Sequence, residues 1–137
     1  MAITTAICNS YKQEILEGVH ALADVYKVAL FTNAATLSAS TTAYATTNEV
    51  VGVAYTAGGA TLTGILTGLS GSTSYLTFSD PSWATSTITA RGCLVYNSSK
   101  SNKAVAAFDF GADITSTAGT FTVDFPVAGA SALIRIA

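Results

Sequence analysis

Few side chains in this sequence could carry out acid–base, nucleophilic or metal chemistry. His20 is the only histidine, and a lone histidine cannot complete a zinc site or a facial triad. Serine is abundant, yet the chain has no Gly-x-Ser-x-Gly sequence, and His20 would be the only histidine base for a serine nucleophile. We therefore expect a structural or surface role for His20, no catalytic residues, no cofactor and no enzymatic activity.

The acidic and thiol side chains do not follow a known site pattern either. Asp109, Phe110 and Gly111 spell the magnesium motif of protein kinases, but no glycine-rich loop or strand lysine motif accompanies them. Asp109 and Asp113 could share a calcium ion, although the spacing of a calcium loop is absent. Cys8 and Cys93 match no metal or redox spacing. We expect no metal site, and two buried thiols rather than a disulfide.

The aromatic side chains allow a binding function to be considered. Trp83 could form a platform for sugar rings together with three tyrosines, because aromatic faces stack on sugars; these are Tyr55, Tyr75 and Tyr96. The alternative is that the same rings belong to the core or to a subunit interface. We consider this second use the better supported one.

Arg91 lies in the middle of a predicted strand among small residues. A charge at an inward or interfacial position needs a partner, since an unpaired buried charge is costly. We expect Arg91 to pair with a carboxylate such as Asp80 or Asp109. Arg91 and Trp83 are both candidates for contact with another subunit.

A β-hairpin is the predicted centre of the fold. Residues 87–96 and 103–110 are two runs rich in β-branched and aromatic residues, and residues 97–102 form a polar tip between them. In the second run, alternation predicts one core face and one partly solvated face. The core face would carry Ala104, Ala106, Phe108 and Phe110, and the solvated face Lys103, Val105, Ala107 and Asp109.

The remaining elements are shorter. A helix is expected over about residues 10–23, with Ser10 as its cap, Gln13 completing a capping box, and an apolar stripe that includes Ile15, Val19 and Leu22. Further strands are predicted at residues 26–32, 49–55, 60–66, 75–78, 119–125 and 132–136, with residues 112–118 as a polar connection. The pattern indicates one mainly β domain over residues 1–137, an antiparallel β-sandwich or jelly-roll-like fold of seven to eight strands with one N-terminal helix.

Composition limits the classes of partner. Charged residues make up 10% of the chain and the net charge is −2, whereas an ordinary soluble domain has about 25% charged residues. Low charge favours self-association, so we expect much of the surface to be covered by other subunits. The six lysines and arginines form no basic stripe, which argues against nucleic acid. No apolar run is long enough for a membrane span and no signal peptide is evident.

Residues 33–48 form a long uncharged segment whose only sizeable apolar residues are Leu37 and Tyr44. A loop of this length is usually functional or interfacial. We expect Leu37 and Tyr44 to be anchors of a contact surface and the isolated protein to be a dimer or trimer.

Several phrases resemble small virion structural proteins of tailed bacteriophages. They lie at residues 26–32 (YKVALFT), 46–50 (TTNEV), 55–59 (YTAGG), 88–97 (ITARGCLVYN) and 103–111 (KAVAAFDFG), with a late strand at 119–121. The resemblance covers nearly the whole chain. It implies a head decoration, or cement, protein that is made in the host cytoplasm, becomes part of the virion and binds the major capsid protein. The alternative is a tail, neck or fibre component that binds a host surface glycan.

Overall fold

The structure, a computed structural model, describes residues 2–137, so Met1, the first residue of the predicted domain, lies outside it. The elements in chain order are β1 (Ala6–Ile7), α1 (Asn9–Leu16), β2 (Tyr26–Phe31), β3 (Ala60–Thr61), β4 (Leu66–Ser70), β5 (Thr73–Thr77), β6 (Ser82–Asn97), the 3-10 helix η1 (Ser98–Lys100), β7 (Lys103–Thr122) and β8 (Ile134–Ile136). These strands pair only in antiparallel fashion over the described residues. The predicted mainly β, antiparallel, sandwich-like fold with one N-terminal helix is confirmed.

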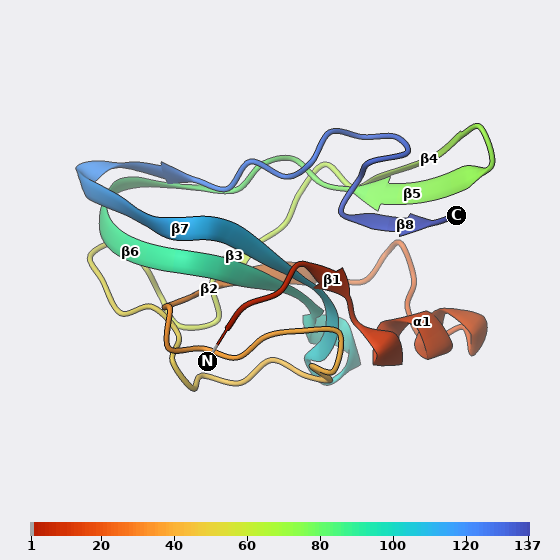
Figure 1. Cartoon of the computed structure of the whole chain (residues 1–137), viewed down its shortest axis with the longest axis horizontal. Helices are drawn as coiled ribbons and strands as arrows, with labels where there is room; N and C mark the ends of the chain where they lie inside the picture. Colours follow the sequence, from red (N-terminus) through yellow and green to blue (C-terminus); the bar gives the residue numbers. More distant parts are fainter. Residues whose placement is uncertain (1) are drawn as a thin grey trace.

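The predicted hairpin is the central pair of the larger sheet, whose strand order is β1-β7-β6-β2-β3 (Figure 1). Both of its strands are longer than the sequence indicates. Residues 112–118, predicted as a polar connection, belong to β7, because this exposed part pairs with an equally polar part of β6. Thr89 and Thr115, for example, share a hydrogen bond of 3.0 Å between their hydroxyls. At the hairpin tip, the Asn97 side chain caps η1 by accepting a hydrogen bond from the Ser99 N–H.

The second sheet has the order β4-β5-β8. The predicted strand at residues 49–55 is wrong, since this segment makes only isolated bridges, one between Glu49 and Phe31 and one between Val53 and Thr87. The reason is that the Glu49 carboxylate turns inward and accepts a hydrogen bond from the Gly58 N–H, which closes the segment into a loop. The predicted strand at residues 60–66 is divided between β3 and the start of β4.

Both faces of the larger sheet are covered. On one face, Tyr26 packs on Phe78 with a centroid distance of 5.6 Å. On the other, Tyr44 from the 33–48 segment stacks on Tyr96 at 4.5 Å and 10°. For this reason Val105, predicted together with Ala107 on a partly solvated face, is fully buried, as is Ala107.

The start of α1 differs from the prediction. Ser10 is not the cap, because the helix begins at Asn9 with Cys8 in the capping position, and no side chain caps it. The Ser10 hydroxyl is instead the one buried side-chain polar group of the described residues for which no hydrogen-bond partner is found. The helix start therefore lacks the capping box that Ser10 and Gln13 suggested.

The end of α1 is also earlier than the predicted position near Ala23. The N–H of Gly18 donates to the Ile15 carbonyl at 3.1 Å, and the N–H of Val19 donates to the Glu14 carbonyl at 3.0 Å. These two bonds form a Schellman motif, and Gly18 has the φ of +73° that this motif requires after a helix. Residues 17–25 are consequently a connector that runs toward β2 and not a further helical turn.

Candidate functional site

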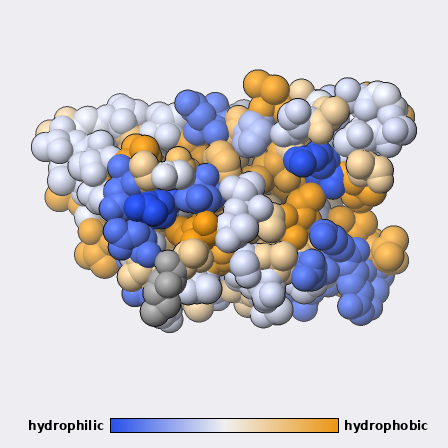
Figure 2. Space-filling view, viewed as in Figure 1, coloured by the Kyte–Doolittle hydropathy of each residue, from blue (hydrophilic) through white to orange (hydrophobic). Residues whose placement is uncertain are grey.

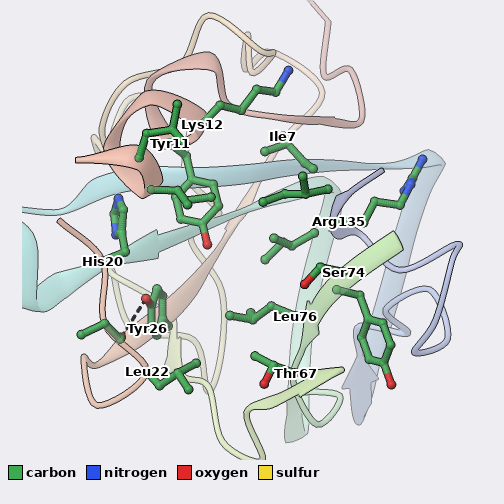
Figure 3. A pocket seen from close by; sticks show the side chains of 16 residues that line it. Ile7, Tyr11, Lys12, His20, Leu22, Tyr26, Thr67, Ser74, Leu76 and Arg135 are labelled. Carbon is green, nitrogen blue, oxygen red and sulfur yellow. Dashed lines mark hydrogen bonds between the residues drawn. The ribbon is translucent and has the colours of Figure 1, made fainter. Parts of the chain in front are cut away.

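A cleft of about 540 Å³ lies between α1 and the β4-β5-β8 sheet (Figure 3). Tyr11 and Ile15 line it on the helix side, and Leu76 and Ile134 line it on the sheet side. Its volume falls within the range of about 300–1,000 Å³ that is typical of ligand pockets. Figure 2 shows apolar side chains at the surface between the sheet and the helix.

Large apolar side chains remain exposed among the residues that line this cleft. Leu16 is 90% exposed, and Leu22 and Ile136 are each 57% exposed. Single exposed apolar residues are common on proteins, but a group of them around one hollow marks an interaction site. The cleft is therefore the candidate site of this chain.

A buried polar network holds the helix side of the cleft in place. Asn97 is fully buried, and its Oδ1 accepts a bond from the Ser99 N–H, so its Nδ2 is the donor. This Nδ2 donates to His20 Nδ1 at 2.9 Å and to Asp24 Oδ2 at 2.8 Å. His20 Nδ1 is thus an acceptor, and its Nε2 donates to Glu14 Oε1 at 2.9 Å.

Two lysines complete this network. Lys103 Nζ lies 3.3 Å from Glu14 Oε2, and Lys100 Nζ lies 3.2 Å from Asp24 Oδ1. The network therefore joins α1 and the 17–25 connector to the tip of the β6-β7 hairpin. His20, whose side chain is only 3% exposed, uses both ring nitrogens in these bonds and has a structural role.

Asp24 should make stability depend on pH. The Asn97 amide, the Ala21 N–H and Lys100 hold the pKa of Asp24 below its usual value, so its carboxylate stabilises the fold above about pH 4 and this contribution is lost as the pH falls through the lower folded pKa. Asp24→Asn should therefore lower the free energy of unfolding by about 1–3 kcal/mol at pH 7 and by less at pH 3, as measured by urea unfolding. Asp124→Asn is the control, because Asp124 is exposed; equal losses at both pH values in Asp24→Asn would contradict the assignment.

A second buried network, which the sequence did not predict, is centred on Glu49. Glu49 is 8% exposed, and its Oε2 accepts a hydrogen bond of 2.6 Å from the Tyr44 hydroxyl. Its Oε1 accepts bonds from the Tyr55 hydroxyl at 2.6 Å and the Gly58 N–H at 2.7 Å. The sequence offers one indication of this network, since Glu49 is the only charged residue between Lys27 and Asp80. An isolated carboxylate near several tyrosines indicates a buried acceptor.

The structure places the predicted anchors of the 33–48 segment inside this chain. Leu37 is 6% exposed and belongs to the core, and Tyr44 is partly buried between Tyr96 and Glu49. Leu37 and Tyr44 therefore have packing partners within the chain, and their contact with another subunit stays a prediction. Most other residues of this uncharged segment are exposed.

Trp83 and Arg91 also have partners within the chain. Trp83 is 7% exposed, and its ring packs on Tyr55 at 5.8 Å and on Phe121 at 6.2 Å. Arg91 Nε donates to Asp113 Oδ1 at 2.9 Å, so its partner is neither Asp80 nor Asp109. Trp83 thus packs on Tyr55, which bonds to the same Glu49 carboxylate as Tyr44, whereas Arg91 belongs to a separate ion pair.

Both cysteines are free and buried, as predicted. Burial raises the pKa of the Cys8 thiol to about 11, and the nearby Glu14 charge adds to this effect. Burial also raises the pKa of the Cys93 thiol. Because the thiolate is the reactive form, neither residue is an activated nucleophile at neutral pH.

Residues 2–137 hold no group of three or more histidine, cysteine or acidic side chains placed to bind a metal ion. None of their helices is long and apolar enough to cross a membrane.

Comparisons with protein-family models, with curated proteins and with solved structures found no match.

Proposed function

We propose that this protein is a structural component of a bacteriophage particle, a head decoration (cement) protein that binds the major capsid protein in the assembled lattice. The observation that carries the proposal is the amount of apolar surface that the chain leaves uncovered. Val51 is 95% exposed and Leu16 is 90% exposed, in a chain with only 10% charged residues. Such surfaces mark places where other subunits bind.

The distribution of this surface supports a bridging role. One exposed apolar set lies around the cleft, and another lies at residues 51–53, where Val53 is 64% exposed. A cement protein holds neighbouring subunits together, so it needs more than one contact surface. The proposal includes self-association as a dimer or trimer, which would cover part of the apolar surface.

A glycan-binding role has less support. A sugar-stacking platform needs exposed aromatic faces, whereas Trp83 is 7% exposed and packs on Tyr55 and Phe121. The aromatic residues considered for that platform are mainly used within the fold. We therefore keep the structural role as the single proposed function.

The test is the copy number of the protein in purified particles, measured by quantitative gel analysis or mass spectrometry. A cement protein should be present at hundreds of copies, and particles that lack it should lose heat resistance, because a ligand that binds only the assembled lattice stabilises it by mass action. Adding the purified protein back should restore that resistance. Light scattering of the isolated protein should give the mass of a dimer or trimer.

Two results would contradict the proposal in different ways. A handful of copies per particle would place the protein in the tail or neck. Absence from particles, together with a monomeric mass in solution, would remove the structural role altogether.

A further inference from the structure

One wall of the cleft ends in a strand edge. In the part of the chain that the structure describes, β8 pairs with β5 and with no other strand, so it is an edge of the β4-β5-β8 sheet. Figure 1 shows that β8 is the strand of this sheet nearest to α1. The free edge of β8 therefore faces the side on which the cleft lies, and an edge strand can accept another strand by backbone hydrogen bonds.

The charges around the cleft are all positive. Lys12 and Arg135 line it, and no aspartate or glutamate does. Lys12 Nζ lies 3.5 Å from the neutral Asn9 Oδ1, and Arg135 Nη1 donates to the neutral Ala132 carbonyl at 2.6 Å. Neither cation has a carboxylate partner among the described residues. In Figure 3 both side chains extend away from the apolar centre of the cavity.

The same charges argue against a second copy of this chain at the β8 edge. A symmetric antiparallel pairing of Ile134–Ile136 with itself would be centred on Arg135. It would place two arginines opposite each other, and like charges in directly opposed positions destabilise a strand pair. The opposite edge, β4, carries no charge in its sequence LTGLS, so that edge is the one suited to self-association.

We propose that the cleft binds an extended segment of another protein, which adds to β8 as a further strand. The segment has the pattern apolar–acidic–apolar. Its apolar side chains lie opposite Ile134 and Ile136 and enter the cleft, while its carboxylate lies opposite Arg135 and pairs with it. Main-chain bonds supply affinity in this mode of binding, and alternate side chains supply specificity. The inference rests on the proposed assembly function only for the source of the segment, another subunit of the particle.

The first test uses the synthetic peptide acetyl-Thr-Val-Asp-Val-Thr-amide and the same peptide with lysine in place of aspartate. The peptides are titrated into the full-length, nitrogen-15-labelled protein, and amide shifts of residues 134–136 report on binding. The aspartate peptide should bind about tenfold more tightly than the lysine peptide, because an aspartate opposite Arg135 is attracted to it and a lysine opposite Arg135 is repelled. Arg135→Glu should reverse this preference. Arg91→Glu changes the net charge equally, lies outside the cleft and should leave the preference unchanged.

A second test joins the strand segment covalently to the end of the protein, so that the result no longer depends on the affinity of a free peptide. The sequence Asn-Gly-Thr-Val-Asp-Val is appended after Ala137, so that a two-residue turn presents the new strand to the free β8 edge, with its aspartate opposite Arg135, at a millimolar effective concentration. The melting temperature of this protein should exceed that of the matching Asn-Gly-Thr-Val-Lys-Val protein by about 3 °C or more.

Three results would overturn the inference. These are equal melting temperatures of the two tethered proteins, a peptide preference that Arg135→Glu does not reverse, and shifts at the cleft caused by dodecanoate but by neither peptide. The last result would show a site for amphiphiles rather than for a strand. Peptide binding by a protein that is absent from phage particles would leave this inference standing and overturn the proposed function. Presence in particles at high copy number without peptide binding would leave the proposed function standing and overturn this inference.

Discussion

Replacing Glu49 with alanine is expected to lower the free energy of unfolding by about 3–5 kcal/mol, because it removes one carboxylate on which three buried donors depend. Those donors are the hydroxyls of Tyr44 and Tyr55 and the N–H of Gly58, at 2.6–2.7 Å. The Tyr55 hydroxyl also accepts a bond of 2.9 Å from the Leu30 N–H, so the damage would extend to β2. Urea unfolding followed by circular dichroism measures this loss, which corresponds to a fall of about 10–15 °C in melting temperature.

Two matched variants separate the hydrogen bonds from the packing. Glu49→Gln keeps the shape of the side chain and one carbonyl acceptor, so it should cost clearly less than the alanine change. Tyr44→Phe removes a single donor and keeps the ring that stacks on Tyr96, and it should cost about 1 kcal/mol. If Glu49→Ala cost no more than Tyr44→Phe, the carboxylate would not be the centre of the network.

The hairpin at the centre of the fold could be predicted from the sequence because the residues that specify it are neighbours along the chain. Apolar and β-branched residues alternate on both sides of a polar tip. At the tip, the Asn97 side chain accepts a hydrogen bond from the N–H of Ser99, two residues further along the chain. The outer halves of β6 and β7 were harder to predict. Residues 112–118 are mostly exposed and polar, so their composition is that of a loop, and only pairing with β6 makes them a strand.

The role of residues 33–48 could not be predicted, because it depends on contacts between distant parts of the chain. Leu37 pairs with Ile3 in an isolated parallel bridge, and Tyr44 reaches Tyr96 across the sheet. Sequence periodicity carries no information on either contact. The low charge of the segment was interpreted as a sign of a surface covered by other subunits, whereas its buried residues pack within the same chain.

The cleft was missed for a related reason. The apolar stripe of Ile15, Val19 and Leu22 was assigned to one helix over about residues 10–23, yet the helix ends at Leu16. Leu22 then lies in the connector and is 57% exposed. The chain leaves the helix at Gly18, and the connector that follows lines the cleft through His20, Ala21 and Leu22.

Gly59→Ala is expected to be the most damaging of the single-methyl changes, with a loss of more than about 3 kcal/mol in the free energy of unfolding. Gly59 has a φ of +78°, which alanine adopts only with strain. In addition, an added Cβ would overlap the backbone carbonyl oxygen of Val28, in the strand that pairs with β3. The turn would have to move away from β2, and this movement would pull the adjacent Gly58 N–H from Glu49.

Gly18→Ala is the matched control for this experiment. Gly18 has a similar φ of +73°, but an added Cβ would meet no atom within 4 Å. It should therefore show the backbone cost alone, about 1 kcal/mol, and the difference between the two variants measures the overlap with Val28. Chemical denaturation of both proteins under the same conditions gives this difference. Equal losses would mean that the turn at Gly59 shifts freely, in which case the Glu49 network does not fix the 49–59 loop against the sheet.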